Sequence, residues 1–179
     1  MRVYILGADG DTFRPIYLAM EDGGLEFTRR FNGTPLKNPL TGNEPFRFVP
    51  RILAKGDTPA YDPTIPVFNR RAVNTLADLL EPNGQLFSFM CQDEEYFLFN
   101  TTRLVDALDE DNCDLERFDD GRIWCIDRHA FFEKKLEGET VFKLRQRPLG
   151  RVYATDPFLQ RVLETGLRGF RFPVVWTSE

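Results

Sequence analysis

Apolar residues recur at the spacing of an α-helix in three stretches of the chain. The first stretch covers residues 69–80, where Asn69 is a suitable N-cap. The sequence EPNG follows at 81–84 and supplies the proline and glycine that stop a helix. We therefore predict a helix with one buried face, formed by Ala72, Val73, Leu76, Leu79 and Leu80.

Two shorter helices are predicted nearer the C-terminus. Residues 102–109 follow a polar pair at 100–101, and their apolar positions are Leu104, Val105 and Leu108. Residues 157–165 follow Asp156, which can cap a helix whose first residue is proline. Gly166 ends this helix, and its apolar stripe is Leu159, Val162 and Leu163.

The remaining apolar runs have the composition of strands. We predict strands at 3–6, 25–31, 46–53, 85–91, 95–101, 121–132, 140–145 and 169–176, with turns at 8–12 and 21–24. The pair 85–91 and 95–101 reads as a hairpin, and the second strand is apolar on both faces, which indicates a central position. The runs 121–132 and 140–145 indicate a second strand pair, and Pro173 confines the last strand to an edge or a bulge. Strand pairs with isolated helices between them favour an α+β fold with a mostly antiparallel sheet.

The length of 179 residues fits one domain, 1–179. Within it, residues 1–62 are less distinctive and lead into a proline-rich connection, since 32–66 holds seven prolines. In the rest, 66–176, cap, proline and glycine residues mark the ends of the predicted helices and strands more clearly. The chain has 17 phenylalanines, so we expect the core to be filled largely by rings, while surplus aromatic residues at a surface often anchor a partner.

The charge pattern narrows the class of partner. A net charge of −5 repels the phosphates of nucleic acid and favours a basic protein partner instead. The apolar run at the N-terminus is too short for a signal peptide or a membrane span, so we expect a cytoplasmic protein without a membrane partner. Three cysteines without CxxC spacing suggest neither disulfides nor a zinc site, and Cys91 and Cys125 are predicted to be buried thiols.

Candidate chemistry is limited to one acidic cluster and one histidine. Asp106, Asp109 and Glu110 would share the exposed face of the 102–109 helix, and Asp111 follows. Such a face is either solvated or able to hold a cation with other groups, although no calcium-loop pattern accompanies it. His129 is the only histidine, and we interpret it as structural or solvent-facing. The GADGD sequence at 7–11 matches no phosphate-binding motif, so we predict no cofactor and no metal.

Several blocks of the sequence resemble a family of predicted bacterial immunity proteins. They are PVFNRRAVNTLADLLEPNGQLFSF (66–89), EEYFLFNTTRLVDALDED (94–111), GRIWCIDRHAFF (121–132), TVFKL (140–144) and VYATDPFLQRVLETGLRGFRFPVVW (152–176). This family is associated with polymorphic toxin systems and was first described as a domain of unknown function. The resemblance implies a non-catalytic protein that binds and neutralises a co-produced toxin. No catalytic residues carry over, because the matching positions look like framework residues: Phe68, Tyr96, Phe99, Phe142, Phe158, Phe170 and Trp176.

Our hypothesis is an immunity protein that inhibits its toxin by stoichiometric binding. Long-range charge would draw a basic toxin to the predicted partner-binding residues, which are Asp106, Asp109, Glu110 and Asp111. One alternative is a small hydrolase or metal-dependent enzyme that uses the acidic cluster together with His129. Another is a subunit or interaction module of a cytosolic assembly.

Overall fold

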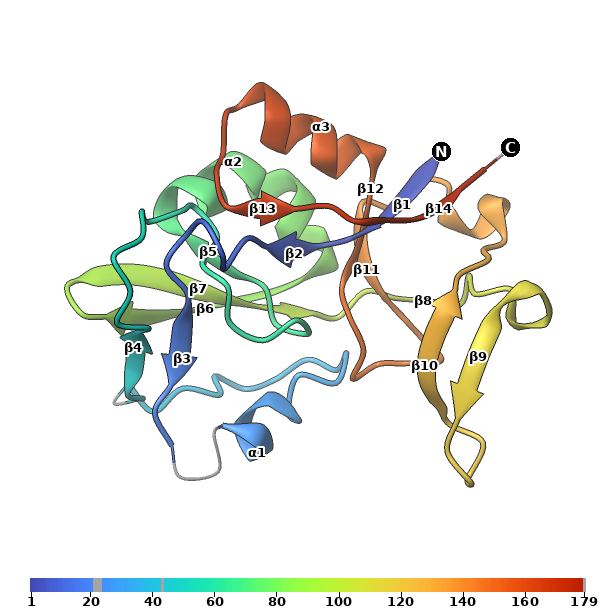
Figure 1. The fold of residues 1–179 in the computed structure, drawn as a ribbon, viewed down its shortest axis with the longest axis horizontal. Coiled ribbons are helices and arrows are strands. Elements are labelled where there is room, and N and C mark those ends of the chain that lie inside the picture. The colour runs from blue at the N-terminus through green and yellow to red at the C-terminus, as the bar shows by residue number, and fades with distance from the viewer. Residues whose placement is uncertain (21–23, 43, 179) are drawn as a thin grey trace.

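The computed structural model describes residues 1–20, 24–42 and 44–178. Helices alternate with many short strands in several sheets, and the strand pairs are antiparallel except for one (Figure 1). The predicted α+β class is therefore confirmed. Three of the four residues of the turn predicted at 21–24 lie outside the described residues.

A five-stranded sheet joins the two ends of the chain. Its order is β14 (Val174–Thr177), β1 (Arg2–Ile5), β12 (Tyr153–Thr155), β11 (Val141–Leu144) and β8 (Leu104–Val105). β8 and β11 run parallel, and the other neighbours run antiparallel. β14 lies at the sheet edge and follows Pro173, as predicted for the closing strand.

A three-stranded sheet contains the predicted hairpin. Its order is β5 (Val67–Asn69), β7 (Glu94–Thr101) and β6 (Gly84–Cys91). β7 occupies the middle of the sheet and is buried on both faces from Tyr96 to Thr101, which confirms its predicted central position. Three two-stranded sheets complete the described strands: β9 (Asp114–Arg117) with β10 (Ile123–Arg128), β2 (Gly7–Ala8) with β13 (Phe170–Arg171), and β3 (Ile16–Leu18) with β4 (Phe46–Phe48).

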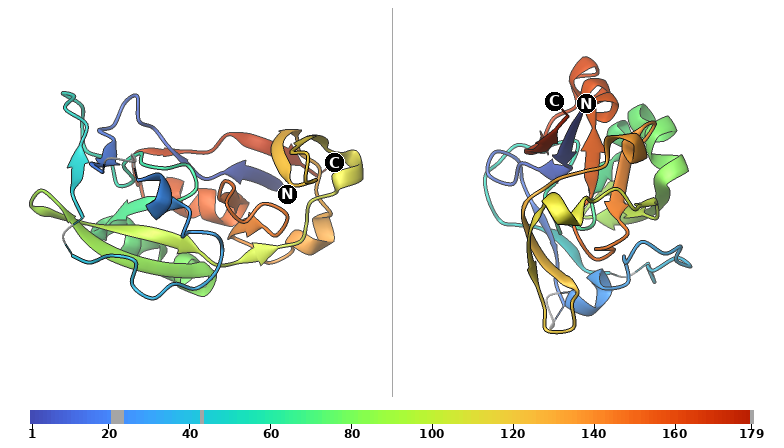
Figure 2. Two further views of the ribbon diagram at one scale, coloured as in Figure 1. Left: turned by 90° about the horizontal axis from the view of Figure 1, so that it is seen from below. Right: turned by 90° about the vertical axis from the view of Figure 1, so that its right-hand side faces the viewer.

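Two of the α-helices lie side by side against these sheets (Figure 2). α2 (Arg70–Leu80) begins as predicted, because the Asn69 side chain accepts a hydrogen bond from the backbone N–H of Ala72 at 2.9 Å. A 3-10 turn, η1 (Glu81–Asn83), then leads directly into β6.

α3 (Asp156–Glu164) begins one residue before the predicted start, with Thr155 in the capping position. The Asp156 carboxylate accepts hydrogen bonds from the backbone N–H of Arg2 at 2.9 Å and from the Tyr4 hydroxyl at 2.8 Å. It therefore holds the N-terminal strand to this helix instead of capping it. Gly166 follows in the left-handed region, with φ of 64°, and ends the helix as predicted.

Three groups of buried side chains fill the spaces between these elements. The two faces of β7 separate the first group from the second, because Phe97 and Phe99 belong to the group that includes residues of α2 and α3, whereas Tyr96 and Leu98 belong to the group that includes residues of the N-terminal third. The third group lies under β9 and β10, against the other face of β11 and β12; its members include Val105, Leu108, Ile123, Ile126, Phe131, Phe142 and Tyr153. Rings occur throughout these groups, in line with the phenylalanine content.

The predicted helix at 102–109 is wrong. Residues 104–105 form β8, which is extended because the backbone N–H groups of Lys143 and Arg145 donate to carbonyls of this segment. Leu108 then bridges Phe131, and the only helical turn nearby is η2 (Glu110–Asn112), a 3-10 helix. Long-range pairing along both halves of the segment outweighs its helix-like spacing.

The strand predicted at 25–31 is also wrong, since residues Leu25–Thr28 form the short helix α1. The helical turn brings the rings of Phe27 and Phe31 together, with their centroids 5.3 Å apart, inside the second buried group. The neighbouring prediction at 46–53 is confirmed only for Phe46–Phe48, the span of β4.

The predicted pairing of 121–132 with 140–145 does not occur. β10 pairs with β9, which precedes it, and β11 pairs with β8 and β12. A 3-10 helix, η3 (Glu133–Leu136), lies between β10 and β11. Of the two thiols predicted to be buried, Cys91 is fully buried and Cys125 is only half-buried.

A buried lysine connects the N-terminal third to β11. Lys143 is 0% exposed, and its ammonium group donates to the backbone carbonyls of Phe31 at 2.8 Å and Pro148 at 3.2 Å. Burial lowers the pKa of Lys143 to about 8, with Asp62 opposing the shift. The charge is thus met by carbonyl dipoles, which hold Phe31 against the sheet.

Candidate partner-binding surface

The four predicted partner-binding carboxylates lie on an irregular segment between β8 and β9. Asp109, Glu110 and Asp111 are consecutive and form the start of η2. Asp106 lies before them, and it is separated from them by the buried pair Ala107 and Leu108. The four carboxylates therefore do not share one face of a helix.

Three of the four carboxylates have polar partners. Asp106 accepts a hydrogen bond from the Gln146 amide at 2.7 Å and lies 3.6 Å from the Lys135 ammonium group. Asp109 accepts from the Asn112 amide at 2.9 Å.

Glu110 pairs with Arg117 at 2.6 Å. Asp111 is exposed and has no ion pair within the described part of the chain. A positively charged partner would therefore meet Asp111 directly, whereas Asp106 and Glu110 are already partly neutralised.

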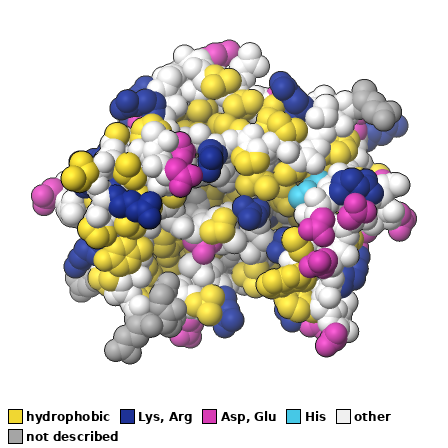
Figure 3. All heavy atoms as spheres, in the orientation of Figure 1, with side chains coloured by type: hydrophobic (Ala, Val, Ile, Leu, Met, Phe, Trp, Pro, Cys, Tyr) yellow, Lys and Arg dark blue, Asp and Glu magenta, His cyan; other side chains and the backbone are white. Residues whose placement is uncertain are grey.

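Residues 106–128, which we call the acidic arm, contain these carboxylates together with β9, its turn and β10. The acidic arm holds nine carboxylates and three arginines, a net charge of −6, whereas the whole chain carries −5. The rest of the chain therefore sums to +1. Figure 3 shows acidic side chains gathered over the part of the molecule that holds β9 and β10.

The acidic arm also exposes two aromatic rings that charge patterning alone did not single out. Trp124 is 56% exposed and Phe118 is 45% exposed, and their ring centroids lie 5.1 Å apart in an edge-to-face arrangement. The guanidinium group of Arg122 lies 5.4 Å from the Phe118 ring centroid. The sequence FDDGRIW at 118–124 places both rings beside a charged turn, but strand alternation alone does not say that Trp124, and not its neighbour Ile123, is the exposed residue.

His129 lies close to the acidic arm along the chain, but its side chain contacts other groups. Its Nε2 atom lies 3.0 Å from the Tyr153 hydroxyl, and its ring stacks on Phe131. Burial, with smaller contributions from Arg147 and Arg151, lowers the pKa of His129 to about 4. The imidazole is therefore neutral near pH 7, and it packs against Phe131 and Tyr153 of the third buried group, in agreement with a structural role.

In 1–20, 24–42 and 44–178, no three histidine, cysteine or carboxylate side chains lie close enough together to hold a metal ion. No helix in these ranges is both long and apolar enough to cross a membrane.

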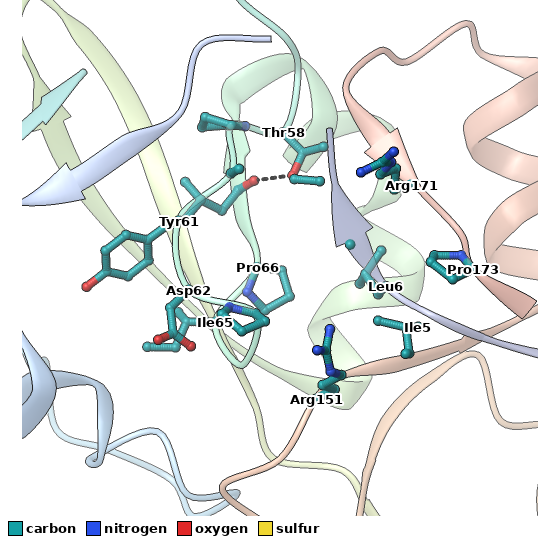
Figure 4. A pocket seen from close by; sticks show the side chains of 16 residues that line it. Ile5, Leu6, Thr58, Tyr61, Asp62, Ile65, Pro66, Arg151, Arg171 and Pro173 are labelled. Carbon is teal, nitrogen blue, oxygen red and sulfur yellow. Dashed lines mark hydrogen bonds between the residues drawn. The ribbon is translucent and has the colours of Figure 1, made fainter. Parts of the chain in front are cut away.

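A cavity of about 280 Å³ lies between the β1–β2 segment and the loop 58–67 (Figure 4). Its lining is largely apolar, and the Thr58 hydroxyl within it already donates to the Val67 carbonyl at 2.7 Å. Arg151 and Arg171 contribute positive charge, and Asp62 contributes the one described carboxylate of the lining. Neither His129 nor the acidic arm reaches this cavity, so it is separate from the predicted surface.

The structure thus presents its concentrated charge and its exposed aromatic pair together on the acidic arm. In a comparison with family models, residues 88–177 match the immunity protein family Imm11. The match spans half of the chain and includes the whole acidic arm, so the chain belongs to this family. A comparison with curated proteins finds no match.

Proposed function

We propose that this immunity protein neutralises a toxin by forming a stoichiometric complex with it, without a chemical step of its own. Membership of the Imm11 family is the observation that carries the proposal. The surface chemistry supports it, because charged and aromatic groups gather on the acidic arm, whereas the His129 side chain is partly buried against Phe131 and Tyr153. Protein partners are recognised by such surfaces.

We further propose that the toxin is basic and first meets the protein through Asp106, Asp109, Glu110 and Asp111. These carboxylates belong to the acidic arm, whose net charge of −6 is more negative than the −5 of the whole chain. A concentrated field of one sign speeds the encounter with an oppositely charged surface and suppresses unsuitable partners. Toxins whose substrates are anionic carry such a surface at their active site, so binding there would also exclude the substrate.

An inhibition titration tests the stoichiometric mechanism. The toxin produced together with this chain is held at a concentration far above the dissociation constant, and its activity is measured against added protein. Stoichiometric binding predicts a linear loss of activity that ends at a fixed molar ratio and does not deepen with time. Complete inactivation by a small fraction of an equivalent, increasing with incubation, would instead show a catalytic mechanism.

Charge reversal tests the proposed encounter surface. The double variant Asp106→Lys and Asp109→Lys should slow association about tenfold at low salt and reduce its dependence on ionic strength. Glu81→Lys with Glu164→Lys is the matched control, because it changes the net charge equally at exposed positions away from the acidic arm. Equal rates for the two double variants would contradict the proposed location.

A further inference from the structure

We infer that the exposed surface of the β9–β10 hairpin is the docking site for a basic toxin, with Trp124 entering an apolar recess of that toxin. This inference rests on the proposed function and adds the apolar anchor that the carboxylates lack. Exposed charge accelerates an encounter, whereas buried aromatic side chains supply most of the affinity of a protein interface.

The hairpin uses its two sides differently. Ile123 and Ile126 are buried in the third group, and Leu115 packs against the same group. Trp124 lies between the two buried isoleucines in sequence, yet it is more than half exposed. On the other side of the hairpin the side chains of Glu116, Trp124 and Asp127 are exposed, so no described residue covers this side.

The aromatic pair is held in place before any partner arrives. The backbone N–H of Phe118 donates to the Arg122 carbonyl at 2.9 Å, and the Gly121 N–H donates to the Phe118 carbonyl at 2.9 Å. The Arg117 guanidinium also donates to the Gly121 carbonyl at 2.9 Å. A fixed turn lowers the entropy lost when Phe118 and Trp124 become immobilised in an interface.

The charge of the hairpin selects a basic partner over an acidic or neutral one. Each of the three arginines in the acidic arm already pairs with a carboxylate of the arm: Arg117 with Glu110, Arg122 with Asp120, and Arg128 with Asp114. Lys135 adds one further pair, with Asp106. Five carboxylates of the arm therefore have no cationic partner within the described residues, namely Asp109, Asp111, Glu116, Asp119 and Asp127.

The combination of an aromatic centre and unneutralised acids defines the complementary surface. It requires a partner with an apolar recess large enough for an indole ring and with lysine or arginine side chains around that recess. The surplus carboxylates would pair with those cations, while the recess would remove the rings from water.

An affinity measurement tests the anchor. A catalytically inactive form of the toxin from the inhibition titration is the probe, and binding is measured by calorimetry for the wild type and for the double variant Phe118→Ala and Trp124→Ala. We expect the variant to bind about thirtyfold more weakly or worse, as for other central aromatic residues. Leu163→Ala is the matched control, because Leu163 is 69% exposed on α3, and it should bind as the wild type does.

Tryptophan fluorescence gives a second readout that does not depend on truncating the anchor. The chain has two tryptophans, so Trp176→Phe leaves Trp124 as its only indole. Emission from Trp124 should shift to the blue when a toxin form lacking tryptophan binds, because the ring leaves water. Wild-type affinity in the double variant, or unchanged Trp124 emission in the complex, would overturn the inference. Failure of the wild type itself to bind the toxin would contradict the proposed function instead, so the two failures are distinguishable.

Discussion

The hairpins β6–β7 and β9–β10 each join two consecutive antiparallel strands, but they use their side chains in opposite ways. β6 and β7 pair over eight residues without a break in register, and β7 is buried on both faces. β9 and β10 pair over four residue pairs with two shifts of register. In β10, Ile123 and Ile126 are buried, while Trp124 and Asp127 are exposed.

This difference separates the framework from the recognition surface. A strand covered on both sides has no position left for a partner, so its residues determine stability. A hairpin covered on one side can vary its other side without disturbing the core. We therefore expect substitutions in β7 to change folding and substitutions on the exposed side of β10 to change binding.

The largest expected effect comes from truncating the framework hairpin. Phe99 is 0% exposed in the middle of β7, and its ring centroid lies 6.1 Å from that of Phe68. Phe99→Ala should lower the free energy of unfolding by about 4 kcal/mol, because it leaves a cavity in the first buried group. Urea denaturation measures this loss, and Ser88→Ala on the exposed side of β6 is the control. A loss below about 1 kcal/mol would contradict the framework role of β7.

A smaller effect should come from Lys143, which belongs to the framework although it is charged. Its folded-state pKa of about 8 lies below the ordinary value of 10.5. Between these two values the unfolded chain binds more protons than the folded one, so the free energy of unfolding should rise with pH. From pH 7 to 9.5 the rise should be about 2 kcal/mol relative to Lys143→Met, which lacks the titrating group.

The rise should level off near pH 10.5, because above the ordinary lysine pKa the group is neutral in the unfolded chain as well. The raised pKa values of Tyr4 and Tyr153 lower the stability of both proteins at high pH, so their contribution cancels in the difference. Denaturation curves at several pH values test it. A constant difference between the wild type and Lys143→Met would show that the ammonium group is not as strongly desolvated as its burial implies.

Local signals in the sequence were sufficient to predict two parts of the framework, α2 and the central strand β7. The Asn69 cap and the apolar spacing of 69–80 predict α2, and apolar side chains on both faces predict the central position of β7. These features depend on residues close together in the chain.

The segment 102–109 was predicted wrongly because its partners, Lys143 and Phe131, lie far away in sequence and impose an extended backbone. The sequence does contain one signal for an extended backbone here, because apolar Val105 and Ala107 flank polar Asp106 with the two-residue period of a strand.

The candidate surface was only partly predictable. The positions of the acidic residues could be predicted, because Asp and Glu are read directly from the sequence. Their arrangement could not, because Asp106 and Asp109 were assigned to one face of a helix that does not form. The exposure of Trp124 also depends on tertiary structure, since the strand pattern of 121–132 does not say which side of β10 faces the core.

The smallest expected effect on stability tests whether the exposed side of β10 is separate from its buried, framework side. Trp124→Ala should change the free energy of unfolding by less than about 0.5 kcal/mol, because the ring is 56% exposed and its edge-to-face contact with Phe118 lies in solvent. Ile126→Ala, two residues further along the strand, should lower it by about 2 kcal/mol or more, because Ile126 is buried in the third group. Urea denaturation of both variants measures how much each residue contributes to stability, and their affinity for the toxin measures how much each contributes to binding. If Trp124→Ala destabilised the chain as much as Ile126→Ala, the large exposed ring would be a structural residue, and the distinction between the two sides of the hairpin would fail.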